Sequence, residues 1–323
     1  MGRSLLVSAT GDGWQNLATE EYLVDHTGPD DAVFFFYRND NAVIIGRNQN
    51  PWAECCLSRM EAEGVQLVRR ISGGGAVYHD GGNLNYSFIM GRRCYDLSRQ
   101  MNLILESVRA VGIPCEYSGR NDILAGGKKF SGNAFCERGE ARLHHGTLLV
   151  HSDLEKLERY LTPDPGKLAS KGIRSVRSRV CNLSGFVPGI RTETLLQSLK
   201  DACRREYGAC PEVPAESLRG EELTRYIARH ASAAWTLGRT PKFDYEVSHR
   251  FPWGGVQLLL CMSGGMIESL QVYSDANDVL LAERIDSLLH GAAFRSGAMA
   301  AALRQAEDSR MDDLADYLLA LDL

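Results

Sequence analysis

The sequence predicts an α+β protein with a mixed or antiparallel sheet, followed by a small second domain. Candidate strands arrive in runs with helices between the runs, and Gly and Pro punctuate the chain over 238–241. At 323 residues the chain also exceeds what one hydrophobic core usually serves. We therefore expect one domain over 1–245 and a smaller α+β domain over 246–323.

The individual elements follow from hydrophobic spacing and from turn residues. Apolar residues recur at helical spacing over 16–24, which predicts the first helix. The apolar runs 32–37 and 42–45 are joined by an Asn/Asp-rich turn and are expected to form a β-hairpin. The same patterns predict helices over 53–63 and 97–111, strands over 65–68, 84–90, 123–124, 128–130 and 147–150, then strands over 256–262 and 266–273 and helices from 278 onward.

Composition and missing motifs exclude several classes of protein. No apolar run approaches the ~20 residues of a membrane span, and the first residues lack a signal-peptide pattern, so a cytoplasmic protein that binds no membrane is expected. The net charge of −5 gives no reason to expect a nucleic-acid partner. Nine cysteines without a C-x-x-C pair argue against a zinc ribbon or a disulfide framework. P-loop and Rossmann fingerprints are also absent from the sequence.

The most unusual stretch runs from Arg69 to Asp80 and contains the glycine triplet 73–75. Consecutive glycines let a ligand approach the backbone closely and expose N–H donors to an anion. Arg70 adds a planar guanidinium, which suits phosphate or carboxylate oxygens. A bare glycine triplet is more often a flexible turn, but the flanking arginine and the immediate return to apolar residues favour a binding site.

A second stretch places Asp122 before the lysine pair Lys128 and Lys129. An acid at the edge of one strand and a lysine on the next could handle magnesium and phosphate, although a hairpin with two solvated lysines fits equally well. Successive residues of a strand project to opposite faces, so only one lysine can enter a pocket. The same rule separates His144 from His145, and joint metal ligation by them is not expected.

These segments occur in one order with plausible gaps, and together they strongly resemble the lipoate-protein ligase family. The segments that carry the resemblance are 69–83, 119–123, 129–134 and 144–149, extended by 47–52, 171–183 and 235–243. The resemblance covers nearly the whole chain, and its motifs are specific together rather than singly.

Members of that family attach lipoate to a lysine of acceptor domains. They first make lipoyl-AMP from lipoate and ATP with magnesium, and they release pyrophosphate. The resemblance implies a catalytic domain like that of biotin protein ligases, related to class II tRNA synthetases, which accounts for the missing P-loop. It also implies, as partners, the lipoyl domains of 2-oxoacid dehydrogenase E2 subunits and the glycine cleavage H protein.

The resemblance also implies roles for single residues. Lys129 would be the catalytic cation that bridges the lipoate carboxylate and the α-phosphate, and Asp122 would position magnesium. The residues implied in binding ATP or the lipoyl-adenylate are Arg70, Ser72, Gly73, Gly74, Gly75, Ala76, Val77, Tyr78, Asn121, Asp122 and Lys129. Those implied in binding lipoate are Arg70, His79, Lys129, Gly132 and His145.

Three other functions fit parts of the pattern. An octanoyl- or lipoyltransferase of the same fold would use a cysteine nucleophile or a preformed acyl donor, and Cys115 and Cys136 flank the lysine segment. A non-catalytic lipoate carrier would not need Lys129. A biotin ligase is less favoured, because the Ser-Gly-Gly-Gly context matches the lipoate branch better.

Overall fold

The computed structural model describes residues 2–118, 121–161, 180–237 and 243–321. The motif residues 119–120, 171–179 and 238–241 lie outside the described residues. The chain divides into two compact units, the first formed by 1–45, 51–71 and 76–236 and the second by 46–50, 72–75 and 237–323. The domain boundary expected at 245 stays a prediction. Among the described residues, no helix is both long and apolar enough to cross a membrane.

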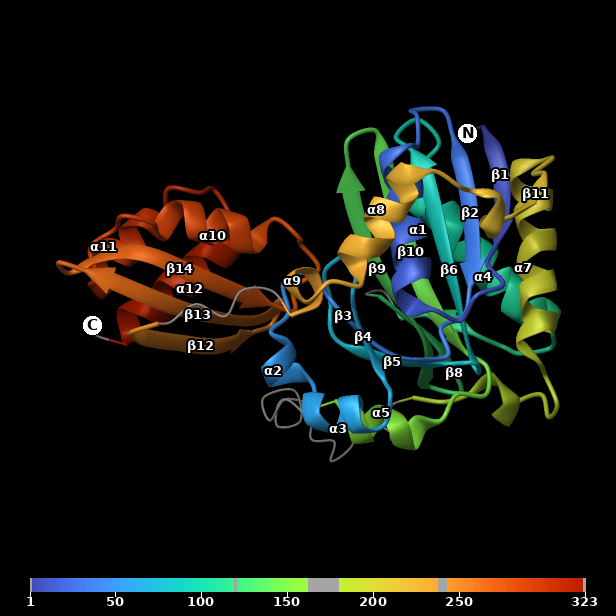
Figure 1. Cartoon of the computed structure of the whole chain (residues 1–323), viewed down its shortest axis with the longest axis horizontal. Coiled ribbons are helices and arrows are strands. Elements are labelled where there is room, and N and C mark those ends of the chain that lie inside the picture. The colour runs from blue at the N-terminus through green and yellow to red at the C-terminus, as the bar shows by residue number, and fades with distance from the viewer. Residues whose placement is uncertain (1, 119–120, 162–179, 238–242, 322–323) are drawn as a thin grey trace. The chain divides into compact units, whose positions relative to one another are not determined.

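An eight-stranded mixed sheet forms the centre of the first unit (Figure 1). Its strand order is β11-β1-β2-β6-β10-β9-β8-β7; β1 runs parallel to β2 and β11, and the other pairs are antiparallel. The strands are β1 (Arg3–Val7), β2 (Ala32–Tyr37), β6 (Asn83–Gly91), β7 (Glu116–Tyr117), β8 (Asp122–Ala125), β9 (Lys128–Arg138), β10 (Ala141–Leu149) and β11 (Glu212–Pro214). The mixed sheet confirms the predicted fold class.

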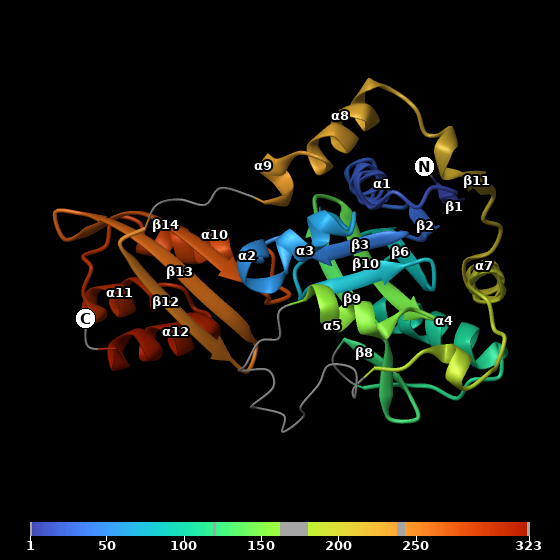
Figure 2. The same cartoon turned by 60° about the horizontal axis from the view of Figure 1, so that its bottom comes forward.

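The helices of the first unit cover both faces of this sheet. Figure 2 shows α1 and α8 on one face and α4 on the other. The helices are α1 (Gly13–Asp25), α2 (Pro51–Glu54), α3 (Leu57–Ala62), α4 (Leu97–Ala110), α5 (Leu154–Tyr160), α7 (Thr192–Tyr207), α8 (Glu221–His230) and α9 (Ala233–Thr236), with 3-10 turns η2 (Leu183–Gly185) and η3 (Ala215–Ser217). The single helix expected over 53–63 is two helices, because Cys55 bridges to Leu161 and the Cys56 N–H donates to the Tyr160 carbonyl.

The two faces of the large sheet differ in polarity. Residues directly opposite each other on paired strands project to the same face. One face carries large apolar side chains that pack against α4 and α7, among them Phe34, Phe36, Tyr86, Phe88 and Leu148. The opposite face, under α1, carries a row in which the apolar Phe35 is followed by the smaller or more polar Ser87, His145 and Ala134. The second face is therefore the one that can hold a polar site.

A second, three-stranded sheet of the first unit has the order β4-β3-β5, formed by β3 (Asn41–Ile45), β4 (Gln66–Arg69) and β5 (Val77–Asp80). The predicted hairpin of 32–37 with 42–45 is wrong, because β2 lies in the large sheet and β3 in this small one. The segment between β2 and β3 does not form a tight turn but is bound to α1. The Asn16 side chain donates to the Arg38 carbonyl and to Asn39 Oδ1.

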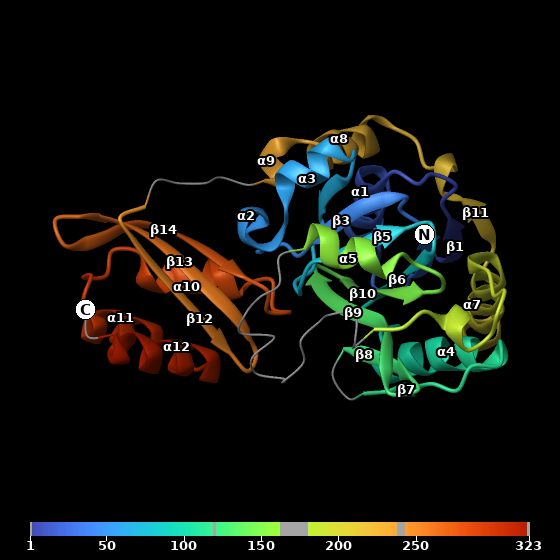
Figure 3. The same cartoon turned by 90° about the horizontal axis from the view of Figure 1, so that it is seen from below.

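The second unit is a three-stranded antiparallel sheet with helices on one of its faces (Figure 3). Its elements are β12 (Tyr245–Phe251), β13 (Gly254–Ser263), β14 (Met266–Ser274), α10 (Leu281–Leu289), α11 (Ser296–Leu303) and α12 (Ser309–Ala320). Gly264 and Gly265 both have positive φ, which is the backbone that a two-residue hairpin requires. The expected pair of strands followed by helices is confirmed.

Candidate active site

Lys129 and Asp122 form an ion pair on the polar face of the large sheet. Lys129 Nζ lies 2.7 Å from Asp122 Oδ1, and both side chains remain more than a third exposed. The ladder between β8 and β9 shifts register, so that Phe130 is an extra residue in β9. A bulge of this kind re-aims a neighbouring side chain. It brings Lys129 onto the face of Gly132, whereas Lys128, the preceding residue, is exposed.

Gly132 makes room for the lysine side chain. A Cβ atom at this position would lie 2.9 Å from Lys129 Nζ and 3.0 Å from its Cε. The Gly132 N–H donates to Thr147 Oγ1 over 3.3 Å, which ties β9 to β10 beside the ammonium group. Glycine in a strand interior often marks a close approach of this kind.

Replacing Gly132 by alanine should displace the Lys129 ammonium group while leaving the fold intact, because the colliding atoms belong to the flexible end of a side chain. If the reaction is the adenylate formation that the resemblance implies, we expect a loss of about 10- to 100-fold in its kcat/KM, since a misplacement of about 1 Å can cost that much. Steady-state kinetics beside a thermal unfolding curve check this. An unchanged rate would show that the ammonium position is not set here.

Asn133 holds the backbone that precedes Asp122. Its side-chain amide and its backbone N–H donate to the Asn121 carbonyl over 2.9 and 2.8 Å. Its Oδ1 accepts from the Tyr86 hydroxyl and, over 2.8 Å, from His144 Nε2. His144 therefore points into the apolar side of the sheet, away from His145. This interior residue of β9 was not predicted as part of the site.

A second polar group surrounds Glu20, which is fully buried on α1. Its Oε2 accepts from Ser87 Oγ over 2.5 Å, from His145 Nδ1 over 2.8 Å and from the Tyr37 hydroxyl over 3.4 Å. Its Oε1 has no hydrogen-bond partner among the described residues. Burying a carboxyl group is costly unless hydrogen bonds compensate it, so Glu20 and its partners mark a candidate polar site.

Arg70 and His79 belong to the same buried group. Burial lowers the pKa of Arg70 to about 10, although Glu20 and Tyr37 act in the opposite direction, and the guanidinium stays charged at neutral pH. Burial, assisted by the charges of Arg70 and His145, lowers the pKa of His79 to about 3, so its ring is neutral. Asn39 Nδ2 donates to His79 Nδ1 over 3.1 Å, which leaves the proton on Nε2. That buried N–H has no partner among the described residues.

The glycine-rich loop belongs to the second unit. Gly74 has φ +93°, and a Cβ atom on Gly73 would collide with the Ala276 carbonyl oxygen. The Gly74 N–H donates to that carbonyl over 3.2 Å, and the buried Ser72 accepts at its own carbonyl from the Arg47 N–H over 2.8 Å. Close backbone packing therefore requires glycine at position 73, and the positive φ favours it at position 74. The sequence predicted that the Gly74 N–H is open to a ligand, but this donor already bonds the Ala276 carbonyl.

The residues after the loop enter β5. Ala76 and Val77 are half-buried, whereas Tyr78 is buried and its hydroxyl donates to Asn41 Oδ1 over 2.9 Å. The Tyr78 ring packs on Tyr160 in the small core. An adenylate contact by Tyr78 would thus involve its backbone.

The structure brings the predicted residues together in two groups. Lys129, Asp122 and Gly132 form one. In the other, Arg70 and His145 lie near Glu20, and His79 lies near Arg70 and His145. Glu20 was missed, although a signal exists. Leu17, Glu20, Glu21 and Val24 occupy the positions i, i+3, i+4 and i+7 at which a helix normally buries apolar residues. Two acids in such a stripe indicate buried charge with partners elsewhere.

Comparison with known proteins identifies the family. Residues 12–204 match the model of the lipoyl protein ligase A/B catalytic domain, and residues 240–316 match that of the bacterial lipoate protein ligase C-terminus. The chain is 40% identical over 294 residues to a lipoate-protein ligase A of Psychrobacter cryohalolentis, covering 88% of this chain and 87% of that protein.

Solved structures agree with the sequence matches. LipL1 of P. falciparum, solved in complex with lipoate, superposes with a TM-score of 0.86 at 27% identity, covering 99% of this chain and 100% of that one. A bipartite ligase of Thermoplasma acidophilum, described with its E2 lipoyl domain, gives a TM-score of 0.64 at 29% identity over 75% of this chain and 98% of that one. A lipoate-protein ligase A bound with ATP gives 0.61 at 28% identity over 74% and 99%. The chain belongs to the lipoate-protein ligase family.

Proposed function

We propose that this chain activates lipoate with ATP to lipoyl-AMP and then transfers the lipoyl group to a lysine of an acceptor domain. The family match and the relatives solved with lipoate or ATP support both substrates. The observation that carries the proposal is the Lys129–Asp122 pair, held over Gly132 on the polar face of the sheet.

Lys129 acts in the first step. A lipoate carboxylate oxygen attacks the α-phosphorus of ATP, a new P–O bond forms, and the bond to pyrophosphate breaks with its electron pair on the leaving group. Two anions must approach each other, so a preorganised cation has a large effect. The Lys129 ammonium group meets both, and Asp122 holds it until the substrates arrive.

Magnesium is the remaining partner of the phosphates. Among the residues that the structure describes, no group of three or more His, Cys, Asp or Glu side chains is arranged to hold a metal ion. Magnesium is usually held by one or two carboxylates together with substrate phosphates, so a single carboxylate fits. Asp122 would hold it there, where the ion would neutralise phosphate charge.

Arg70, His79 and His145 are our candidates for the lipoate and adenylate side of the site. A buried guanidinium and a buried His79 Nε2–H without a described partner are both donors that suit carboxylate or phosphate oxygens. The ligand chain adds apolar affinity, because burying its four methylenes contributes roughly 3 kcal/mol. Ser72–Val77, the Tyr78 backbone and Asn121 complete the proposed adenylate contacts.

The second step acylates a lysine amine. The amine attacks the carbonyl carbon of lipoyl-AMP, an amide bond forms, and AMP leaves, while Lys129 stabilises the oxyanion. Only about 0.1% or less of a lysine with pKa ~10.4 is neutral at pH 7, so the mixed anhydride and accurate placement must compensate. As acceptors we propose lipoyl domains of 2-oxoacid dehydrogenase E2 subunits and the glycine cleavage H protein. The cytoplasmic location stays a prediction.

Buried thiols argue against the cysteine-dependent transferase. Cys115 and Cys136 are both buried, and burial raises the pKa of Cys115. The half-buried Cys181, which sequence reasoning did not consider, donates its N–H to the Lys129 carbonyl over 2.8 Å, but burial raises the pKa of its thiol too. The reactive species of a cysteine is the thiolate, which a raised pKa disfavours.

Pyrophosphate exchange tests the proposed function. Labelled pyrophosphate should enter ATP only when lipoate is present, because adenylate formation is reversible. Serine variants of Cys115, Cys136 and Cys181 should each exchange within about twofold of the unmodified protein, since these thiols form no bond in the proposed reaction. Octanoyl transfer from a carrier without any exchange would establish the transferase instead.

A further inference from the structure

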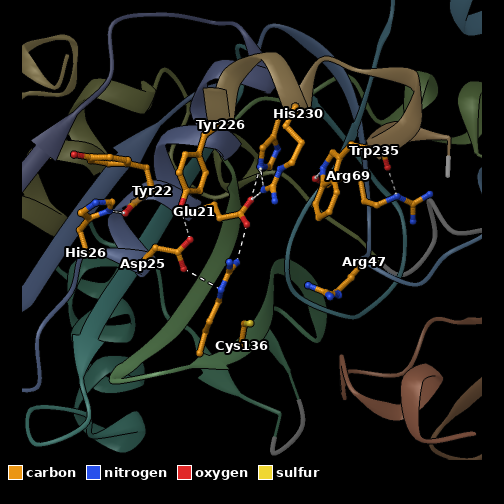
Figure 4. Close-up of polar contacts among 12 residues, drawn as sticks. Glu21, Tyr22, Asp25, His26, Arg47, Arg69, Cys136, Tyr226, His230 and Trp235 are labelled. Carbon is orange, nitrogen blue, oxygen red and sulfur yellow. Dashed lines mark hydrogen bonds and ion pairs between the residues drawn. The ribbon is translucent and has the colours of Figure 1, made fainter. Parts of the chain in front are cut away.

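A second buried carboxylate, Glu21, lies beside Glu20 on α1 but has different partners (Figure 4). It accepts from His230 Nε2 over 2.6 Å, from Arg138 Nη1 over 2.7 Å and from Arg229. Arg138 also contacts Asp25 over 2.9 Å, and the Tyr226 hydroxyl donates to Asp25 over 2.5 Å. These contacts hold the last turn of α8 on α1.

The last turn of α8 also contacts the indole of Trp235, which lies on α9. The guanidinium carbon of Arg229 lies 4.4 Å from the centroid of the Trp235 ring. The rings of His230 and Trp235 are 5.3 Å apart. The indole is therefore packed against two side chains that Glu21 orients.

Trp235 and Arg69 exchange hydrogen bonds, as Figure 4 shows in part. Trp235 Nε1 donates to the Arg69 carbonyl over 3.0 Å. In return, Arg69 Nε donates to the Trp235 carbonyl and Arg69 Nη2 to the Thr236 carbonyl, each over 2.9 Å. We name these three bonds the Arg69–Trp235 clamp. Arg69 is buried and is the last residue of β4.

The clamp fixes the peptide unit that leads into Arg70. The Arg69 carbonyl and the Arg70 N–H belong to one planar peptide group. Trp235 binds the carbonyl end, and the Arg70 N–H donates to the Ile45 carbonyl over 3.0 Å at the other end. A plane held at both ends fixes the direction in which the Arg70 side chain leaves the backbone. That side chain is buried near Glu20 and Tyr37.

We propose that Trp235 is a positioning residue for the reaction: through the clamp it sets where the Arg70 guanidinium meets the substrate, without touching substrate itself. The inference rests on the proposed role of Arg70 in the site.

The chain contains a matched control for this role. Trp14 Nε1 donates to the Leu67 carbonyl over 2.8 Å, which is the same kind of bond to the same strand, two residues earlier. Both tryptophans are half-buried. If an indole–carbonyl bond merely stabilises β4, removing either one should have the same effect.

The test compares Trp235→Phe with Trp14→Phe in the full-length protein. Phenylalanine keeps an aromatic ring and removes the N–H donor. We expect Trp235→Phe to lower kcat/KM for lipoyl-AMP formation by about tenfold, because small misplacements of a binding group cost that much. Trp14→Phe should stay within about twofold, and thermal unfolding should shift by a similar small amount in both.

A double-mutant cycle shows whether Trp235 acts through Arg70. In an Arg70→Lys background, Trp235→Phe should lower kcat/KM by less than about threefold beyond the loss from Arg70→Lys alone, because the effects of coupled residues are not additive. The effect of Trp14→Phe on kcat/KM should be the same in both backgrounds. If the losses in kcat/KM from Trp235→Phe and Arg70→Lys multiply as independent effects do, or if the two tryptophan variants lose equally, this inference is wrong and the proposed function stands. An unmodified protein that forms no lipoyl-AMP would overturn the proposed function and this inference with it.

Discussion

Replacing Lys129 by alanine should lower the rate of lipoyl-AMP formation by about a thousandfold and leave the thermal unfolding midpoint nearly unchanged. Removing one preorganised donor from a charge-stabilising site costs about 10²–10³-fold, and an ammonium group that meets two anions belongs at the upper end. Stability should change little, because the pair with Asp122 is more than a third exposed on both sides and such pairs contribute little.

Lys128 is the matched control for this experiment. It has the same side chain one residue earlier on β9, but it is exposed and projects to the opposite face. Lys128→Ala should therefore keep lipoyl-AMP formation within about twofold. Single-turnover formation of lipoyl-AMP is the appropriate measurement, since it separates the chemical step from transfer. If both lysine variants lose the same fraction of the rate, or if Lys129→Ala forms lipoyl-AMP at an unchanged rate, the Lys129 ammonium group does not take part in the chemical step.

Local patterns predicted the elements better than they predicted their pairing. The helix over 16–24 and the strand over 32–37 were correct because their spacing and composition are local signals. The hairpin was wrong because β2 pairs with β1 and β6, and no residue near its ends encodes those distant partners. Strand β9 was predicted over 128–130 only, yet it continues to Arg138. Gly132 in this segment makes room for Lys129, whereas Asn133 projects to the opposite, apolar face.

The candidate site was predictable where a motif carries it and not where tertiary contacts create it. The resemblance implied Lys129 as the catalytic lysine, and the register shift at Phe130 gives a physical reason why Lys129 and not Lys128 lies on the face of Gly132. Glu20 was missed because glutamate is normally a surface residue. Its partners come from β2, β6 and β10, and only the folded sheet brings them to α1. The contact between Trp235 and Arg69 was not predicted either, although both residues lie in motif segments, because only the fold brings them together.

Replacing Glu21 by glutamine should lower the free energy of unfolding by about 3 kcal/mol at neutral pH. Burial alone would raise the pKa of Glu21, but hydrogen bonds from His230, Arg229 and Arg138 outweigh it and lower the pKa from 4.5 to about 2. Each pKa unit corresponds to about 1.4 kcal/mol in the free energy of unfolding. A carboxylate with a lowered pKa stabilises the fold above its unfolded pKa, and this contribution fades as the pH falls toward 2. The cost of the substitution should therefore shrink between pH 5 and pH 2.

Glu63 provides a control that separates the effect of the buried Glu21 carboxylate from that of a solvent-exposed ion pair. Hydrogen bonds from Arg159 and Tyr160 also lower the pKa of Glu63 to about 2, but its partner Arg159 is more than half exposed, so solvent screens the pair. Glu63→Gln should accordingly destabilise the protein far less than Glu21→Gln. Urea unfolding at pH 7, 5 and 3 measures both variants. If the Glu21→Gln loss is independent of pH, or no larger than that of Glu63→Gln, the ionised Glu21 carboxylate is not what holds α8 on α1, and Trp235 keeps its place through the Arg69–Trp235 clamp without it.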